Sequence, residues 1–269
     1  VGMSLDAIEK EMRSFKPSSM YSLPDNEPAI GSLSNIEKYL ERIFNEHYGD
    51  RFADRDNKRP QFEDLDIPLA VVATDLVTRR EVVLDSGDLI DAIRATIAIP
   101  VLFPPVKIGD WALVDGGLVN SVPFDIARAR GATHTIAIAL GNSSPYGTPR
   151  EAPTPTRNGK GALGIRWAEV LDGNLFDRAL YQATRDPLWD VVTAVFDIVT
   201  VSSVDLRMAI SPPDVIIRPQ IGTIGLLDFH TIDAGIEAGR AAVQREAKDI
   251  EKILTALAEH RSASEETTI

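Results

Sequence analysis

The sequence predicts an α/β fold whose central sheet is mostly parallel. Residues 68–74 are nearly all apolar, as expected of a strand that is covered on both faces. A strand–helix–strand pattern over residues 111–140 is typical of a crossover between parallel strands. Residues 231–257 carry an apolar stripe at helical spacing, which indicates a terminal helix packed on the sheet. We expect residues 1–258 to form one domain and residues 259–269 to form a disordered tail.

Two amphipathic helices are predicted before the first strand. Apolar residues recur at helical spacing over residues 5–15, directly after Ser4, and serine favours the helix N-cap position. A second helix is expected from Ser34 to about residue 48. After the first strand, the pair Arg79-Arg80 indicates a turn into a shorter strand at residues 81–84.

The next segment is predicted to contain a capped helix, a hairpin and a crossover. Asp88 can cap a helix over residues 89–97. Gly109 stands at the first turn position between two short apolar stretches, which predicts a tight hairpin. A short helix over residues 123–131 and a strand over residues 134–140 complete the expected parallel unit.

Composition excludes several classes of function. The chain has 28 Lys and Arg against 40 Asp and Glu, and its net charge of -12 argues against nucleic acid as a partner. The same charge gives no support to electrostatic binding of anionic membranes, although apolar contact at a membrane surface is left open. The chain contains no cysteine, which is typical of a reducing compartment, so we expect a cytoplasmic location.

Metal and nucleotide chemistry lack their usual sequence patterns. None of the four histidines lies in a His-x-x-x-His or Glu-x-x-His arrangement, so no metal site is expected. No Gly-x-x-x-x-Gly-Lys-Ser/Thr loop is present either, which disfavours a nucleotide phosphate site.

A serine nucleophile is not evident in these 269 residues. Serine hydrolases carry it in Gly-x-Ser-x-Gly at a sharp turn between a strand and a helix. The nearest match, Gly2-Met3-Ser4-Leu5-Asp6, has Asp6 in place of the second glycine and no strand before it. We therefore interpret Ser4 as a helix N-cap.

Two aspartates follow predicted strands. Asp115 precedes Gly116 and Gly117, and glycines allow the backbone to turn sharply and to approach other groups closely. Its carboxylate can act as a general base, but Asp-Gly is also a common turn pair, and spacing alone leaves both interpretations open. Asp75 is a second candidate carboxylate, for which capping of the local backbone is the better interpretation.

Several segments resemble the patatin-like phospholipase family. Residues 94–106 follow its Arg-Ala-Ser-x-Ala-x-Pro-x-x-Phe-x-Pro-Val pattern, with Thr96 where serine is common. Residues 115–123 are similar to Asp-Gly-Gly-x-x-x-Asn-x-Pro, and residues 73–76 look like the strand end that precedes both motifs. The pair Pro68-Leu69, and Asp228-Phe229 with Gly239, fit the bacterial branch that resembles neuropathy target esterase (NTE). The resemblance covers residues 1–258 and is most specific over 66–140.

The resemblance implies a three-layer α/β/α fold and a Ser-Asp dyad in which Asp115 is the base and no histidine takes part. It implies lipid carboxylic esters as substrates, an acyl-enzyme intermediate and no cofactor. The family's glycine-rich oxyanion loop and its Gly-x-Ser-x-Gly motif are not in this sequence, so the resemblance implies that an N-terminal portion of the fold is missing. We expect a groove or lid for the acyl chain within residues 141–208, which resemble the family less.

Three hypotheses follow for this chain. It can be part of a lipid acyl hydrolase whose nucleophile lies elsewhere, in which case the chain alone is inactive. It can instead be a non-catalytic short form that binds lipid or a partner, or one half of a split enzyme. The sequence leaves its oligomeric state open.

Overall fold

The computed structural model describes residues 3–15, 32–52, 59–140, 187–221 and 231–266. The chain divides into two compact units, one made of residues 1–121, 153–200 and 225–230, the other of residues 122–152, 201–224 and 231–269. The division falls within one helix, α7 (Pro187–Ile210). The predicted α/β class is confirmed, because the units combine helices with strands.

The first unit begins with helices whose caps were predicted correctly. Ser4 caps α1 (Leu5–Ser14), its Oγ accepting a hydrogen bond from the Ala7 N–H at 3.2 Å. Asp88 caps α3 (Leu89–Thr96) by accepting from the Asp91 N–H at 2.9 Å. Helix α2 (Ser34–Phe52) starts at the predicted residue and runs one turn further, and a short 3-10 helix, η2 (Phe62–Asp64), follows.

A four-stranded sheet forms the centre of the first unit. Its order is β2-β1-β4-β3, with β1 (Val71–Asp75), β2 (Arg80–Leu84), β3 (Val106–Ile108) and β4 (Trp111–Asp115). Every neighbouring pair in it is antiparallel. The turns after β1 and β3 are too short for a parallel crossover, and the predicted hairpin at Gly109 is present, with φ of 57° at the glycine. The prediction of a mostly parallel sheet is therefore wrong for these strands.

The parallel pairing in the described part of the chain lies in the second unit. Strand β5 (Ile136–Ile138) pairs with β6 (Val215–Ile217), Ile136 opposite Val215. Helix α4 (Phe124–Ala129) does follow β4, as predicted, but β4 and β5 belong to different sheets. The sequence pattern over residues 111–140 predicted β4 as the parallel partner of β5, and this prediction is wrong. The partner is β6, which comes much later in the chain.

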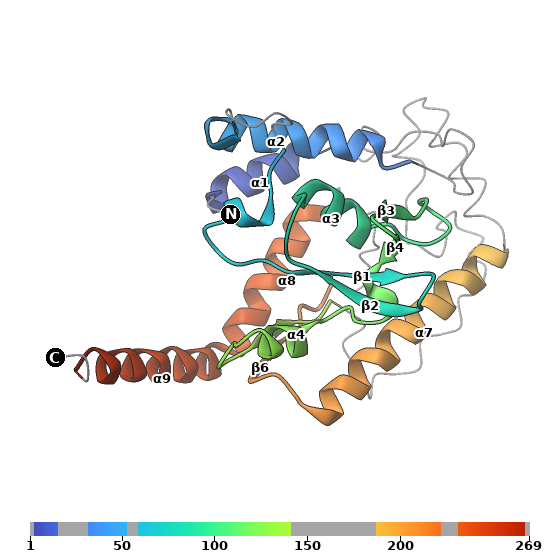
Figure 1. Ribbon diagram of the computed structural model, residues 1–269. Helices are drawn as coiled ribbons and strands as arrows, with labels where there is room; N and C mark the ends of the chain where they lie inside the picture. Colours follow the sequence, from blue (N-terminus) through green and yellow to red (C-terminus); the bar gives the residue numbers. More distant parts are fainter. Residues whose placement is uncertain (1–2, 16–31, 53–58, 141–186, 222–230, 267–269) are drawn as a thin grey trace. The chain divides into compact units, whose positions relative to one another are not determined.

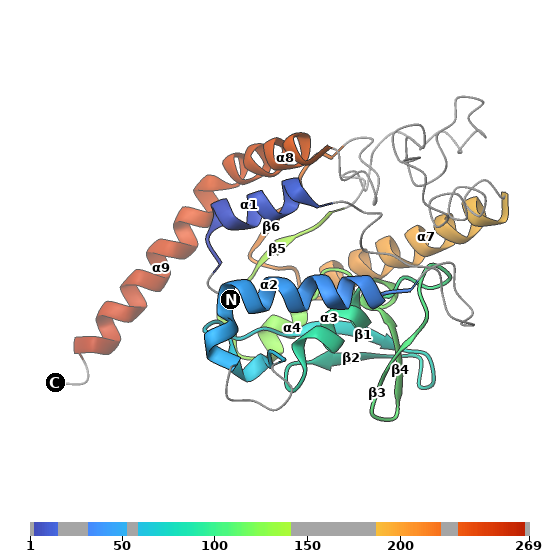
Figure 2. The same ribbon diagram turned by 90° about the horizontal axis from the view of Figure 1, so that it is seen from above.

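The core of the first unit lies between its sheet and its helices. Helix α3 packs on the sheet and α2 packs on α3 (Figures 1 and 2). Leu89, Ile90 and Leu113 are fully buried where α3 and the sheet meet. The complete three-layer arrangement stays a prediction.

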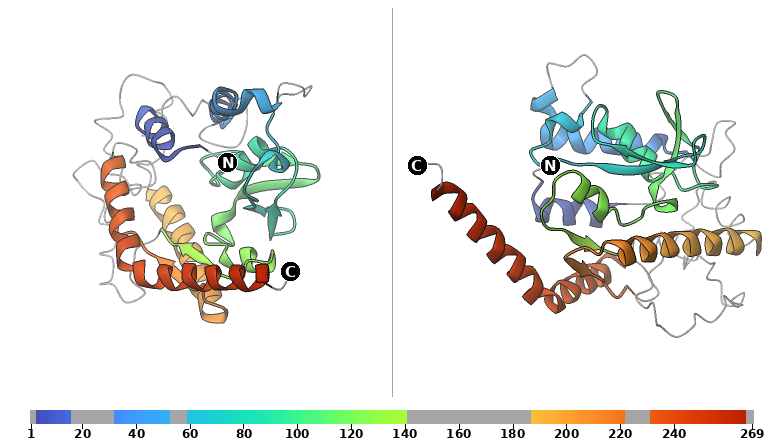
Figure 3. Two further views of the ribbon diagram at one scale, coloured as in Figure 1. Left: turned by 90° about the vertical axis from the view of Figure 1, so that its left-hand side faces the viewer. Right: turned by 60° about the horizontal axis from the view of Figure 1, so that its bottom comes forward.

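The C-terminal region of the second unit holds two helices where one was predicted. Helix α8 (Ile232–Arg245) and helix α9 (Ala247–Glu266) meet at an angle at Glu246 (Figure 3). Val215 and Ile217 of β6 pack against Ala242 and Ile253 from these helices. Helix α9 extends into the predicted tail 259–269, because residues up to 266 include alanine, glutamate and arginine, which favour helix, and no glycine or proline.

Within the described residues, no helix combines the length and the apolar character needed to cross a membrane.

Candidate active site

Asp115 lies at the junction between a central strand and a short 3-10 helix. It is the last residue of β4 and the N-cap of η3 (Gly116–Leu118). Its backbone is fixed on two sides: its N–H donates to the Ala98 carbonyl at 2.9 Å, and its carbonyl accepts from Thr74 Oγ1 at 2.9 Å. The carboxyl group therefore projects from a backbone that has little freedom to move.

The Asp115 carboxyl group is partly buried and has one described hydrogen-bond donor. The Gly117 N–H donates to its Oδ1 at 2.7 Å. Burial raises the pKa of Asp115 above its usual value, and the Gly117 hydrogen bond opposes that rise. A raised pKa makes the ionised carboxylate a stronger base than a solvated aspartate.

The two glycines after Asp115 are required by space. A Cβ on Gly116 would lie 2.1 Å from the Val72 carbonyl oxygen on β1. A Cβ on Gly117 would lie 2.9 Å from Asp115 Oδ1, so a side chain there would displace the carboxylate. Neither glycine has φ in the left-handed region, so close approach, and not turn geometry, explains the pair.

Sequence reasoning did not foresee how residues 94–106 support Asp115. The Ala98 carbonyl, just after α3, receives the Asp115 N–H. Thr96, the departure from the family pattern, donates from Oγ1 to the Val72 carbonyl at 2.6 Å, beside Gly116. The only signal for this arrangement was the order of the two motifs along the chain.

Asp75 is confirmed as a residue that caps the local backbone. It is buried, and its carboxylate accepts from the Val77 N–H, from the N–H and the hydroxyl of Thr78, and from the Ala112 N–H. The Thr78 hydroxyl bond is the largest cause that lowers the pKa of Asp75, and the backbone N–H groups add to it. A carboxylate that is saturated with donors in this way is a poor base.

Helix α7 contributes two side chains beside the glycine pair. Thr200 Oγ1 donates to the Gly117 carbonyl at 3.0 Å. The Phe196 ring lies one turn earlier, with its Cζ 3.7 Å from the point where a Gly117 Cβ would stand. Both residues fall in the segment that was expected to form an acyl-chain groove, while residues 141–186 of that segment lie outside the described residues.

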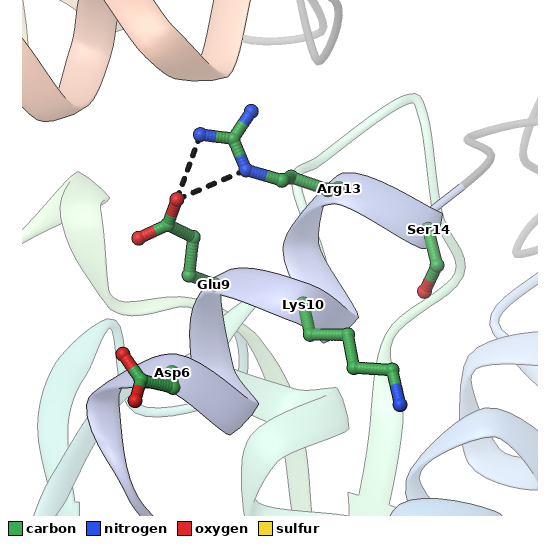
Figure 4. Close-up of a pocket in the computed structure, with 5 residues that line it drawn as sticks. All are labelled: Asp6, Glu9, Lys10, Arg13 and Ser14. Atoms are coloured by element: carbon green, nitrogen blue, oxygen red, sulfur yellow. Dashed lines mark hydrogen bonds and ion pairs between the residues drawn. The ribbon is translucent and has the colours of Figure 1, made fainter.

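A surface hollow on α1 is separate from this site. Figure 4 shows its lining of charged and polar side chains, Asp6, Glu9, Lys10, Arg13 and Ser14. The main interaction there is the Glu9–Arg13 ion pair at 2.7 Å, on one exposed helix face. None of these residues supplies an apolar wall for a lipid chain.

One cluster of metal-ligand residue types occurs among the described residues. Ligand atoms of Glu11, Glu46 and His47 lie within 4.8 Å of one another. Arg42 already pairs with both glutamates, at 3.1 Å to Glu11 and 2.7 Å to Glu46. The guanidinium therefore supplies the positive charge that these carboxylates require.

Comparison with known proteins supports the resemblance seen in the motifs. Residues 1–128 match the family model for patatin-like phospholipases. An uncharacterized NTE family protein of Mycobacterium tuberculosis is 33% identical over 175 residues, which is 64% of this chain and 27% of the relative. Another, from Mycobacterium bovis, is 40% identical over 149 residues, which is 55% of this chain and 38% of that protein.

A mammalian relative is also similar over a shorter region. Patatin-like phospholipase domain-containing protein 7 of Mus musculus is 35% identical over 102 residues, which is 37% of this chain and 7% of that protein. The chain thus spans well under half the length of each of these relatives. Residues 1–128, which contain Asp115 and its two glycines, are thus similar to the patatin-like phospholipase family, and the bacterial relatives carry the NTE family name.

Proposed function

We propose that this chain is part of a lipid acyl hydrolase in which Asp115 is the base of a Ser-Asp dyad. The observation that carries the proposal is the setting of the Asp115 carboxyl group. Among the described residues one donor, the Gly117 N–H, binds it at the end of β4, and burial raises its pKa. The family match over residues 1–128 supports lipid esters as the substrate class.

The proposed reaction uses Asp115 as a proton carrier. Asp115 accepts the proton of a serine hydroxyl while the serine oxygen attacks the ester carbonyl carbon. The proton then passes to the departing alcohol, which leaves an acyl-enzyme. Water loses a proton to Asp115, attacks the acyl carbon and releases the fatty acid, and the serine recovers its proton.

We further propose that the nucleophilic serine is not among these 269 residues. No Gly-x-Ser-x-Gly sequence is present, and the Ser4 hydroxyl accepts the Ala7 N–H as an ordinary cap. The 269-residue chain should therefore neither hydrolyse lysophosphatidylcholine or p-nitrophenyl butyrate nor react with a fluorophosphonate probe. Labelling that disappears in Ser4→Ala would overturn this assignment and would identify Ser4 as the nucleophile.

The role of Asp115 is tested in a longer form of the protein that includes a Gly-x-Ser-x-Gly motif. Asp115→Asn should abolish ester hydrolysis, because asparagine keeps the shape and the acceptor oxygen but cannot accept the proton. Asp110→Asn, at the exposed turn between β3 and β4, is the matched control and should keep activity. Full activity in Asp115→Asn would refute the dyad.

Contact with a lipid surface is a second part of the proposal. Val195, Ile198, Leu206 and Ile210 recur at helical spacing along α7, and 54%, 64%, 63% and 76% of their respective surfaces are exposed. Since the net charge is -12, we expect apolar contact with zwitterionic lipid and not attraction to anionic lipid. In a flotation assay the wild-type chain should float with phosphatidylcholine vesicles, and the Ile198→Ser/Leu206→Ser variant should not. Equal flotation of both proteins would exclude this face.

A further inference from the structure

Gly117 connects helix α7 to the Asp115 carboxylate. The Gly117 N–H donates to Asp115 Oδ1 at 2.7 Å, and the Gly117 carbonyl accepts from Thr200 Oγ1 at 3.0 Å. The three residues lie in the same compact unit, although Thr200 is far from the other two in sequence. Gly117 is therefore bonded to both side chains, through its carbonyl to the Thr200 hydroxyl and through its N–H to the Asp115 carboxylate.

The N–H and the carbonyl of Gly117 belong to two different peptide planes, so they are held by different contacts. A glycine has the widest choice of backbone angles of any residue, so local sterics alone fix the orientation of one plane relative to the other poorly. A residue with a side chain cannot stand here to restrict the backbone angles, because its Cβ would lie 2.9 Å from Asp115 Oδ1. The carbonyl of Gly117 is a group through which a neighbour can limit rotation at this residue without touching the carboxylate.

Other contacts fix the residues before Gly117. Thr74 holds the Asp115 carbonyl, and the Gly116 carbonyl accepts the N–H groups of Val119 and Asn120 at 3.0 and 2.8 Å. The Gly116 carbonyl shares a peptide plane with the Gly117 N–H, so its bonds hold that plane. Among the described residues, Thr200 is the donor to the Gly117 carbonyl in the next plane. Phe196, one turn earlier on α7, has its Cζ 3.7 Å from the point where a Gly117 Cβ would stand, so two side chains of α7 lie beside this glycine.

We propose that Thr200 is a positioning residue, which holds Gly117 so that its N–H keeps the Asp115 carboxylate in one orientation. The catalytic meaning of this role rests on the proposed function, but the hydrogen-bond relay itself does not. The alternative is that the Thr200 hydroxyl only fastens α7 and has no effect on the carboxylate.

The relay can be tested by NMR in the 269-residue chain, without any activity. Thr200→Val keeps the side-chain shape and removes the donor, whereas Thr200→Ser keeps the donor. In Thr200→Val the Gly117 amide should exchange with solvent about threefold to tenfold faster, as expected for the loss of one hydrogen bond. The pKa of Asp115, followed through the chemical shift of its carboxyl carbon, should rise because the bond from Gly117 is weakened. The carboxyl signal is assigned by its absence in Asp115→Asn.

Controls separate positioning from a merely structural effect. Thr200→Ser should restore both readouts to wild-type values. Thr255→Val removes a hydroxyl-to-carbonyl bond of the same kind on α9 and should change neither readout. Thr200→Ala replaces threonine with a better helix former, so it provides the same test if the valine variant does not fold.

The outcome distinguishes this proposal from the proposed function. Unchanged exchange at Gly117 and unchanged titration at Asp115 in folded Thr200→Val would overturn the relay, even if Asp115 proves to be catalytic. A clear response of both readouts supports the relay, even if Asp115→Asn later keeps ester hydrolysis.

Discussion

Substitution of Gly116 by alanine should destabilise the first unit more than most single changes. The added methyl would lie 2.1 Å from the Val72 carbonyl oxygen and 2.6 Å from the Val72 carbonyl carbon. Contacts of a real Cβ essentially never fall below 3.0 Å, so β1 and η3 would have to separate by about 0.9 Å. Both groups belong to the backbone, and no side-chain rotation can relieve the overlap.

The Val72 carbonyl is also engaged by other residues, which raises the cost of moving it. It accepts the Thr96 hydroxyl at 2.6 Å, and its strand pairs with β2 on one side and β4 on the other. Overpacking typically costs about 1–3 kcal/mol, and a backbone clash in a central strand places Gly116→Ala near about 3 kcal/mol. For a protein of this size that corresponds to a fall of roughly 6–12 °C in the melting temperature.

Thermal unfolding followed by circular dichroism measures this effect. Gly49→Ala is the matched control: it lies in α2 of the same unit, nothing stands within 4 Å of its Cβ position, and alanine favours helix by up to about 1 kcal/mol. The two variants should therefore shift the melting temperature in opposite directions. A Gly116→Ala protein as stable as wild type would refute the argument that space requires this glycine.

Three aspartates should respond differently to conversion to asparagine. Asp75→Asn should lower the urea midpoint of unfolding, most clearly above pH 3.8. The pKa of Asp75 is lowered in the fold, so the ionised carboxylate stabilises the protein at those pH values and this contribution is lost as pH falls below 3.8. Asp214→Asn loses the ion pair with Arg128 and weakens the hydrogen bonds that Thr135 donates, and it should cost no more than about 1 kcal/mol after solvent screening. Its pKa falls from 3.8 to about 2, so the cost should vanish as pH drops through that interval. Asp115→Asn should be at least as stable as wild type at neutral pH and lose that advantage below pH 3.8; a lower melting temperature at pH 7 would contradict the raised pKa.

Local features of the fold could be predicted from the sequence because their causes are local. Ser4 and Asp88 were identified as caps from residue type and position, and the Gly109 hairpin from its glycine. Sheet pairing depends on contacts between distant segments, so the partner of β5 and the antiparallel register of β1 with β4 could not be deduced. The break at Glu246 between α8 and α9 gave no signal either, since neither glycine nor proline marks it.

In the candidate active site, too, the local features could be predicted from the sequence and the long-range contacts could not. Asp115 was singled out because glycines follow a strand end, but the donors that hold it come from Thr74 on β1 and the segment after α3. Thr200 gave no signal in the sequence, because a threonine within an apolar helix is usually a packing residue. Its hydrogen bond to Gly117 becomes visible only when α7 is placed beside η3.

The two aspartates at strand ends have pKa values shifted in opposite directions, and the antiparallel direction of their strands explains why. Asp75 ends β1 and Asp115 ends β4, and in the antiparallel register Ala73 faces Asp115 while Asp75 faces Leu113. A parallel sheet would have brought both carboxylates to one edge, where each would have raised the pKa of the other. Here they lie at opposite ends of the strand pair, so Asp75 can be saturated by turn donors while Asp115 is left partly buried with a single described one. Asp115 can thus be the stronger base of the two without help from a second carboxylate.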